Sequence, residues 1–263
     1  DISETITVNS EIRHAIGRLS SWMAPRHVGV RLPLLGSSAT IYYEPKGVCL
    51  ILGPWNFPFN LNLIALVGAV AAGNCVILKP SEHAPNSSAL LKKILEECFP
   101  PEELAVVEGD VSVAEKLLSL PFNHIFFTWS TAVGKIVMTA AAKHLASVTL
   151  ELGGKSPVVV DETADLDRAA SRIAWIKCMN GGQTCIAPDY VLVHESAHDQ
   201  LVEKLKIWTE KFYGATPEAR RQTPDLSRMV HDRHFQAVKG LLDDAVGRGA
   251  TVAFGGRTDA AER

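Results

Sequence analysis

The sequence has few of the features that mark secreted, metal-binding or membrane-spanning chains. Its five cysteines are an odd number and form no C-x-x-C pair, which indicates a reduced, intracellular protein rather than a disulfide framework. The nine histidines show no zinc-ligand spacing. The longest nearly apolar run, residues 61–72, is interrupted by Asn62 and is too short to cross a bilayer. We therefore expect a cytoplasmic protein with no metal site and no membrane segment in this portion.

An excess of basic residues is also absent. The net charge is −3 over 263 residues, and the lysines and arginines are scattered along the chain. This balance argues against a nucleic-acid partner, because phosphates require a basic surface. The length and the 47% hydrophobic content suit one large or two ordinary globular domains, whose cores need no disulfide or metal.

The first part of the chain alternates between two kinds of pattern. Short, continuously apolar runs are separated by segments with helical periodicity. Strands that are apolar throughout are covered on both faces, so the pattern predicts an α/β fold with a doubly wound parallel sheet of the dinucleotide-binding type. We expect the strands at 47–52, 75–78, 104–107, 124–127 and 148–152, and the helices at 61–72, 84–98, 113–120 and 131–145.

The Gly153-Gly154 pair interrupts this pattern and predicts a boundary between a dinucleotide-binding domain, residues 1–152, and a second α/β domain, residues 153–263. The first domain also contains a predicted helix over 1–24, an irregular segment over 25–38 and a short edge strand over 39–43. The second domain contains too few strands to close a sheet and is expected to be incomplete at its C-terminal end. Its predicted strands are 157–160, 190–193 and 251–254, and its predicted helices are 166–180, 197–213 and 231–246.

Polar residues follow the predicted strands, at the edge where open α/β sheets bind ligands. The loop 53–58 contains Asn56, whose amide can stabilise an oxyanion or can simply bond its own turn. Lys79 and Glu82 can hydrogen-bond ribose hydroxyls. In the alternative interpretation, Ser81 caps the next helix and Glu82 lies in its first turn. Both interpretations of this segment are compatible.

Two further strand ends carry candidate groups. Ser130 begins a predicted helix, and a helix N-terminus attracts anions, although a plain N-cap explains the residue equally well. Glu151 ends a predicted strand beside a Gly-Gly turn, where it can serve as a general base or as a paired structural carboxylate.

The segment 180–190 is the clearest candidate for chemistry. A helical pattern ends in Gly181-Gly182, Cys185 follows on a loop, and Pro188 precedes an apolar strand. Glycines allow a sharp turn and a close approach of the backbone. A cysteine on a loop between two rigid elements is a candidate nucleophile, whereas an ordinary free cysteine packs in a core.

Taken together, the loops resemble the aldehyde dehydrogenase family, and in particular its class 3 branch, which acts on long-chain and aromatic aldehydes. The resemblance rests on five blocks in the family's order, which are 53–58, 79–82, 127–135, 151–155 and 183–190. It covers the chain from about Trp22 nearly to its end and represents the central portion of a family member. The resemblance implies that residues 1–152 are the NAD(P)-binding domain and that residues 153–263 are a partial catalytic domain.

The resemblance implies a role for each matching residue. Cys185 is the nucleophile that forms a thiohemiacetal and then a thioester, Asn56 belongs to the oxyanion hole, and Glu151 activates the hydrolytic water. The cofactor is NAD or NADP, the substrate is a small-molecule aldehyde, and the full-length parent is a homodimer. The residues that the resemblance assigns to cofactor binding are Trp55, Lys79, Ser81, Glu82, Ser130, Val133 and Gly153.

The chain also departs from the family pattern. Trp129 stands where the family usually has glycine, so its indole is expected to obstruct the cofactor pocket. Gly181 stands where alanine or serine is usual, and we expect this change only to loosen the turn. These departures keep a second interpretation open, in which the chain is an inactive fragment that acts at most as a cofactor-binding scaffold. A coenzyme A-acylating relative is disfavoured, because it would not need Glu151 as a hydrolytic base.

Overall fold

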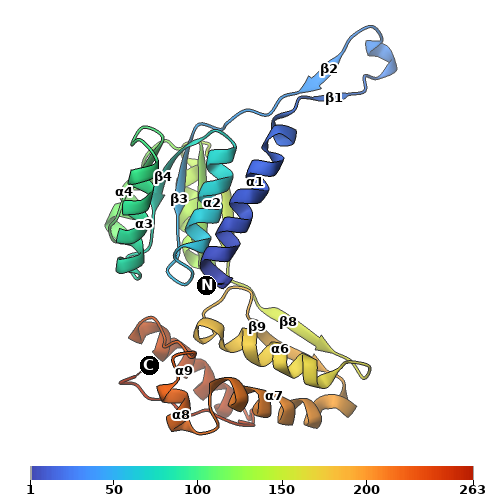
Figure 1. Cartoon of the computed structure of the whole chain (residues 1–263), viewed down its shortest axis with the longest axis vertical. Coiled ribbons are helices and arrows are strands. Elements are labelled where there is room, and N and C mark those ends of the chain that lie inside the picture. Colours follow the sequence, from blue (N-terminus) through green and yellow to red (C-terminus); the bar gives the residue numbers. More distant parts are fainter. Residues whose placement is uncertain (1, 263) are drawn as a thin grey trace. The chain divides into compact units, whose positions relative to one another are not determined.

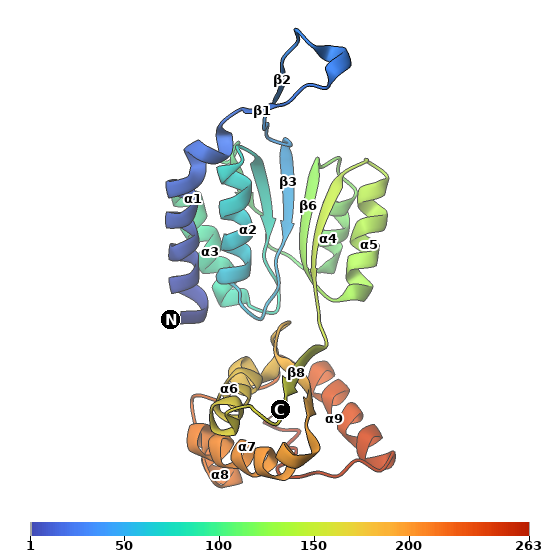
Figure 2. The same ribbon diagram turned by 90° about the vertical axis from the view of Figure 1, so that its right-hand side faces the viewer.

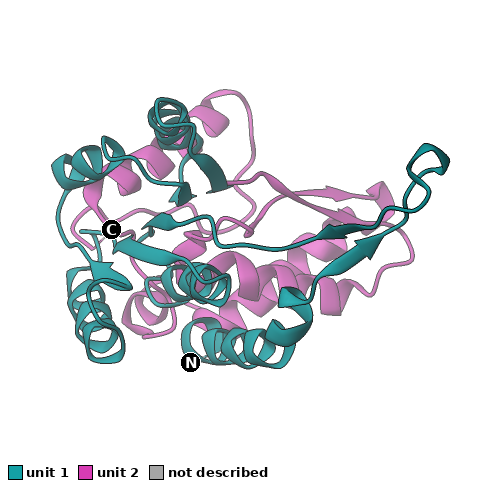
Figure 3. Ribbon diagram, turned by 90° about the horizontal axis from the view of Figure 1, so that it is seen from above, with its two compact units in different colours: residues 1–152 teal, residues 153–263 magenta. Residues whose placement is uncertain are grey.

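The computed structural model describes residues 2–262, and the chain divides into two compact units, residues 1–152 and 153–263 (Figure 3). The first unit begins with a short π-helical turn, Ile2–Ile6, and helix α1, Thr7–Met23. A hairpin of β1, Arg26–Val28, and β2, Ala39–Ile41, follows. The prediction of irregular structure over 25–38 missed β1, whose backbone is ordered by antiparallel pairing with the expected edge strand.

The central sheet of the first unit has five parallel strands in the order β5-β4-β3-β6-β7. From β3 the chain adds β4 and β5 on one side of the sheet and then β6 and β7 on the other side, as in doubly wound folds. This strand order confirms the predicted layout. The strands are β3, Val48–Leu52; β4, Cys75–Lys79; β5, Leu104–Val106; β6, His124–Trp129; and β7, Ser147–Leu152.

Helices cover both faces of this sheet, with α1, α2 and α3 on one face and α4 and α5 on the other (Figure 2). Two apolar cores result, one centred on Leu78 and Leu91 and the other on Leu50 and Val137. The burial of alternate side chains on opposite faces explains why each strand is apolar throughout. The helices are α2, Asn60–Ala71; α3, Pro85–Cys98; α4, Val111–Leu118; and α5, Thr131–Ala142.

The second unit has a two-stranded parallel sheet of β8, Ser156–Val160, and β9, Pro188–Val193. Helices α6, Leu166–Cys178, and α7, His198–Tyr213, pack together beside it (Figure 1), with Val160, Ala170 and Leu201 in the core. Tyr213 Oη donates a 3.2 Å hydrogen bond to the carbonyl of Trp175 and so joins the two helices. Helices α8, Pro217–Gln222, and α9, Asp232–Gly247, complete the unit.

One prediction for the second unit was wrong, and one helix was not predicted. Helix α8 lies in the polar segment 214–227, for which the sequence predicted no element, and Thr216 Oγ1 caps its first turn. The strand expected at 251–254 is absent from the described structure. Residues 251–254 pair with no strand there, and an apolar run without a neighbouring strand leaves its backbone hydrogen bonds unmade.

Candidate active site

The loop 53–58 after β3 is fixed at its base by Asn62, a fully buried side chain on α2. Its amide Nδ2 donates a 2.7 Å hydrogen bond to the carbonyl of Pro58. A Cβ atom added at Gly53 would lie only 1.7 Å from Asn62 Oδ1, so glycine is required by the close approach of this amide. Gly53 N also donates to the Lys79 carbonyl at 3.0 Å, which joins the loop to the end of β4. The candidate oxyanion residue Asn56 therefore lies on a loop anchored at both ends.

Glu4 supports the same loop from the N-terminal segment. Its Oε2 accepts hydrogen bonds from the backbone N–H groups of Phe59, at 3.2 Å, and Asn60, at 2.7 Å, at the start of α2. Burial raises the pKa of Glu4, and the two backbone donors oppose this rise without cancelling it. A carboxylate at a helix N-terminus is stabilising. No sequence pattern suggested this contact, because more than fifty residues separate its partners.

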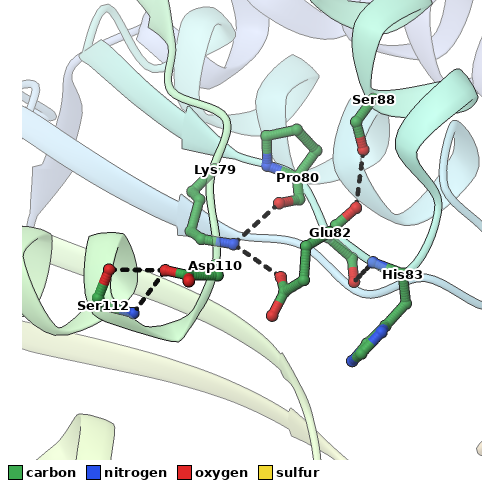
Figure 4. A network of polar contacts seen from close by, with 8 residues as sticks. Lys79, Pro80, Glu82, His83, Ser88, Asp110 and Ser112 are labelled. Carbon is green, nitrogen blue, oxygen red and sulfur yellow. Dashed lines mark hydrogen bonds and ion pairs between the residues drawn. The ribbon is translucent and has the colours of Figure 1, made fainter.

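Lys79 and Glu82 form a partly buried ion pair at the end of β4 (Figure 4), with Lys79 Nζ 3.0 Å from Glu82 Oε2 and 3.1 Å from the Pro80 carbonyl. Burial tends to raise the pKa of Glu82. Its own backbone N–H and the Lys79 ammonium outweigh this effect, so the pKa lies below its ordinary value and the group is an anion at neutral pH. An ionised carboxylate is an acceptor for hydroxyl donors such as those of a ribose.

Ser81 does not cap α3. That helix starts at Pro85 after Ala84, which provides no side-chain cap. Ser81 instead forms a turn, in which its Oγ accepts from His83 N at 3.3 Å and its carbonyl accepts from Ser88 Oγ at 2.9 Å. The capping interpretation of Ser81 and Glu82 was therefore wrong, because three residues separate Ser81 from the first helical position, Pro85.

The N-terminus of α5 and an aromatic cluster lie at the end of β6. Ser130 caps α5, with its Oγ accepting from Val133 N at 3.4 Å, which confirms the predicted N-cap. The half-buried indole of Trp129 packs against Trp55, with ring centroids 6.3 Å apart, and against His83, at 5.8 Å. The strand ends at β3, β4 and β6 therefore meet through aromatic rings. The participation of His83 was not predicted, since a histidine on a loop has no pattern of its own.

Glu151 lies on β7, the edge strand, where it pairs in register with Thr128 of β6. Its side chain is exposed within its unit. An exposed carboxylate at the carboxyl end of a strand is accessible to water and to ligands. Gly153, the first residue of the second unit, is also exposed.

Cys185 lies in the second unit at the corner of a tight turn, in which Ala187 N donates to the Thr184 carbonyl at 3.1 Å. Cys185 is an exposed residue. A Cβ atom added at Gly154 would lie 3.1 Å from the Cys185 carbonyl, so a glycine at this position allows the segment before β8 to approach this turn. The Lys155–Asp189 ion pair, at 2.7 Å, joins the same two segments.

Three consecutive residues with positive φ precede the turn, namely Asn180 at 51°, Gly181 at 63° and Gly182 at 76°. The sharp turn predicted from the glycines is confirmed. The expectation that Gly181 only loosens the turn was wrong, because a Cβ atom there would lie 2.9 Å from the Ser227 carbonyl in a left-handed backbone conformation. Gly181 is a requirement of this packing.

The structure thus places the predicted residues in two groups. The first unit brings together the loops of Asn56, Lys79–Glu82 and Trp129–Ser130, and carries Glu151 on its edge strand. The second unit presents Cys185. The described residues include no cluster of metal-binding side chains, and none of their helices is long and apolar enough to span a bilayer.

The first unit thus defines a class of fold, a doubly wound α/β sheet of the dinucleotide-binding type, and the second unit carries an exposed cysteine on a turn. The model of the aldehyde dehydrogenase family matches residues 3–263, and the chain belongs to that family.

Relatives of known sequence extend the comparison. The chain is 46% identical over 260 residues to aldehyde dehydrogenase family 3 member A2 of Rattus norvegicus, covering 99% of this chain and 52% of the relative. It is 48% identical over 260 residues to the rat aldehyde dehydrogenase described as dimeric and NADP-preferring, covering 99% and 56%. The chain therefore spans about half the length of these relatives.

Solved structures agree with the fold. A substrate-bound Staphylococcus aureus AldH matches with a TM-score of 0.90 and 41% identity, covering 100% of this chain and 56% of that one. A Mycobacterium tuberculosis aldehyde dehydrogenase complexed with NAD+ matches with a TM-score of 0.86 and 25% identity, covering 97% and 52%.

Proposed function

We propose that the complete protein containing this chain oxidises an aldehyde to a carboxylic acid with NAD or NADP. In this proposal residues 1–152 bind the cofactor and residues 153–263 form part of the catalytic domain. The observation that carries the proposal is that Cys185 is exposed at the corner of a turn, just after three consecutive residues with positive φ, two of them glycines. A thiol presented in this way on a rigid scaffold suits nucleophilic catalysis.

The described residues of the first unit fit the adenosine end of a dinucleotide. The ionised carboxylate of Glu82 and the ammonium of Lys79 can hold ribose hydroxyls. The N-terminus of α5, with Ser130 and Val133, offers a positive dipole end to the phosphates. Trp55, Ser81 and Gly153 complete the proposed binding residues. The nicotinamide, when bound, supplies a hydride acceptor.

The choice between the two cofactors rests on opposing observations. The Glu82 anion repels a 2′-phosphate, which favours NAD. A relative of this chain is described as NADP-preferring, which favours NADP. We therefore retain both cofactors in the proposal.

The proposed chemistry divides the oxidation into two steps. The Cys185 thiolate adds to the aldehyde carbon, and the new oxyanion accepts a hydrogen bond from the Asn56 amide and from the Cys185 backbone N–H. Loss of hydride leaves a thioester on Cys185. Glu151 then takes a proton from a water molecule, whose oxygen attacks the thioester and releases the acid and the free thiol.

A second candidate function rests on Trp129. Its indole occupies the position immediately before the α5 N-terminus, between Trp55 and His83. An indole that covers this approach would leave a chain that binds the cofactor weakly, as a scaffold without catalysis.

Two further proposals concern the complete protein. The name of the dimeric relative supports a homodimer. The five free cysteines support a cytoplasmic location, because free thiols are typical of reducing compartments.

The Glu151→Gln variant of the complete protein tests the proposed mechanism. Glutamine removes the general base and leaves the nucleophile, so we expect a burst of reduced cofactor followed by turnover at least about tenfold slower than wild type. Stopped-flow absorbance at 340 nm measures both phases, and Glu162→Gln, at another exposed acid, is the matched control. Unchanged steady-state turnover would refute the role given to Glu151.

A further inference from the structure

Gln183 connects the cysteine turn to a segment that is distant in the sequence. Its Nε2 donates to the Asn180 carbonyl at 2.8 Å and to the Arg228 carbonyl at 3.1 Å. Its Oε1 accepts from Val230 N at 2.9 Å. The side chain therefore bonds three backbone groups at once, two of them in the stretch between α8 and α9.

The backbone immediately before Gln183 depends on such support. Asn180, Gly181 and Gly182 all have positive φ, a conformation that an asparagine adopts only at a cost of about 1 kcal/mol or more. Hydrogen bonds and packing must hold this stretch, and Gly181 packs directly on the Ser227 carbonyl. The packing of Gly181 and two of the three Gln183 hydrogen bonds therefore lead to residues 227–230.

The cysteine turn starts at the residue that follows Gln183. Thr184 begins the turn that presents Cys185, so a displacement of the Gln183 backbone moves the thiol by a comparable distance. Misplacement of a reacting atom by about 1 Å reduces catalysis on the order of a hundredfold. The position of Cys185 is therefore sensitive to the contacts of one amide side chain.

We propose that Gln183 is a positioning residue, which fixes the cysteine turn against the 227–230 segment and thereby aligns the Cys185 thiol. The role rests on the proposed function, because alignment matters only when Cys185 is the nucleophile. Residues 227–230, which lie outside the motif blocks of the chain, become a second determinant of the geometry of Cys185.

The test combines hydrogen exchange with kinetics on the complete protein. Gln183→Met keeps the length of the side chain and removes all three bonds, whereas Gln183→Glu keeps an acceptor for Val230 N. Gln222→Met is the control, since the Gln222 side chain donates to the exposed Glu218 side chain on α8, at 2.8 Å, and not to the backbone of the 180–183 stretch. We expect amide exchange at Val230 to rise at least about tenfold in Gln183→Met and to stay within about threefold of wild type in Gln183→Glu.

For the kinetic measurement, we expect kcat to fall at least about tenfold in Gln183→Met, with the KM values for aldehyde and cofactor within about threefold. Unchanged exchange at Val230, or an unchanged kcat with faster exchange, would overturn the proposal. Should Gln183→Met fail to fold, Gln183→Glu decides the question: a reduced kcat with slow Val230 exchange supports alignment by the two lost donors, and a wild-type kcat overturns it. Wild-type protein that oxidises no aldehyde would refute the proposed function and the alignment role together. Wild-type protein that oxidises an aldehyde, together with Gln183 variants whose kcat equals that of the wild type, would refute the alignment role and leave the proposed function intact.

Discussion

Gly53 and Asn62 offer the sharpest test of how the Asn56 loop is held. A methyl group at Gly53 would overlap the whole amide of Asn62, with its Cβ 1.7 Å from Oδ1, 2.4 Å from Cγ and 2.7 Å from Nδ2. Asn62 is 0% exposed, so its amide has no solvent-filled space into which to move. The backbone at Gly53 lies outside the left-handed region, so this clash is the main obstacle to alanine.

The magnitude follows from two contributions. Insertion of a methyl group into a packed core costs about 1–3 kcal/mol, and displacement of the Asn62 amide from the Pro58 carbonyl costs about 1 kcal/mol more. We therefore expect Gly53→Ala to lower the free energy of unfolding by about 2–4 kcal/mol. Asn62→Ala loses the same hydrogen bond but removes Oδ1, a buried oxygen that has no partner among the described residues, so its net effect should lie within about 1 kcal/mol.

A double-mutant cycle measures the coupling between these two residues. Urea denaturation followed by tryptophan fluorescence gives the four free energies of unfolding, and the double variant should resemble Asn62→Ala. Gly68→Ala on α2 is the control, because no atom lies within 4 Å of its added Cβ, and it should be stabilising by about 0.5–1 kcal/mol. A coupling energy below about 0.5 kcal/mol would show that the loop is not held in this way.

Two further predictions use the same chain. Burial raises the pKa of Tyr213 to about 12, so the unfolded chain releases this proton first and the free energy of unfolding should fall as pH rises from about 10 to 12. Tyr213→Phe should remove about 1 kcal/mol of that fall between pH 9 and 11, and an identical pH dependence in both forms would contradict the assignment. Trp129→Gly should tighten NAD binding at least about tenfold, or roughly 1.4 kcal/mol, by opening the approach to the α5 N-terminus. Isothermal titration calorimetry measures this change, with Trp22→Ala as the control, and equal affinities would mean that the indole lies clear of the cofactor.

The parallel sheet was predictable because its signal is local. Each strand is a short apolar run such as Val48–Leu52, and its burial on both faces follows from the fold class alone. The strand β1 and the absence of a strand at 251–254 were not predictable in this way. Both depend on whether a partner strand lies alongside, and partnership is decided by tertiary structure rather than by composition.

The candidate site shows the same division. Cys185, Lys79 and Glu82 could be selected as candidate site residues because each follows a predicted strand or a glycine turn in the sequence. The hydrogen bonds that hold the neighbouring loops could not be predicted. Glu4 reaches Asn60 and Gln183 reaches Val230 across long separations in the chain, and a single sequence contains no local pattern for such side-chain to backbone bonds.

The central claim is that Cys185 is the nucleophile, and its alkylation rate tests this most directly. Cys75 and Cys98 are also exposed, so they are internal controls for access, whereas Cys49 is buried. With limiting iodoacetamide and peptide mapping of the complete protein by mass spectrometry, we predict that Cys185 reacts first. Aldehyde together with cofactor should slow the labelling of Cys185 alone. Labelling spread evenly over the exposed cysteines, or concentrated at Cys98, would contradict the account.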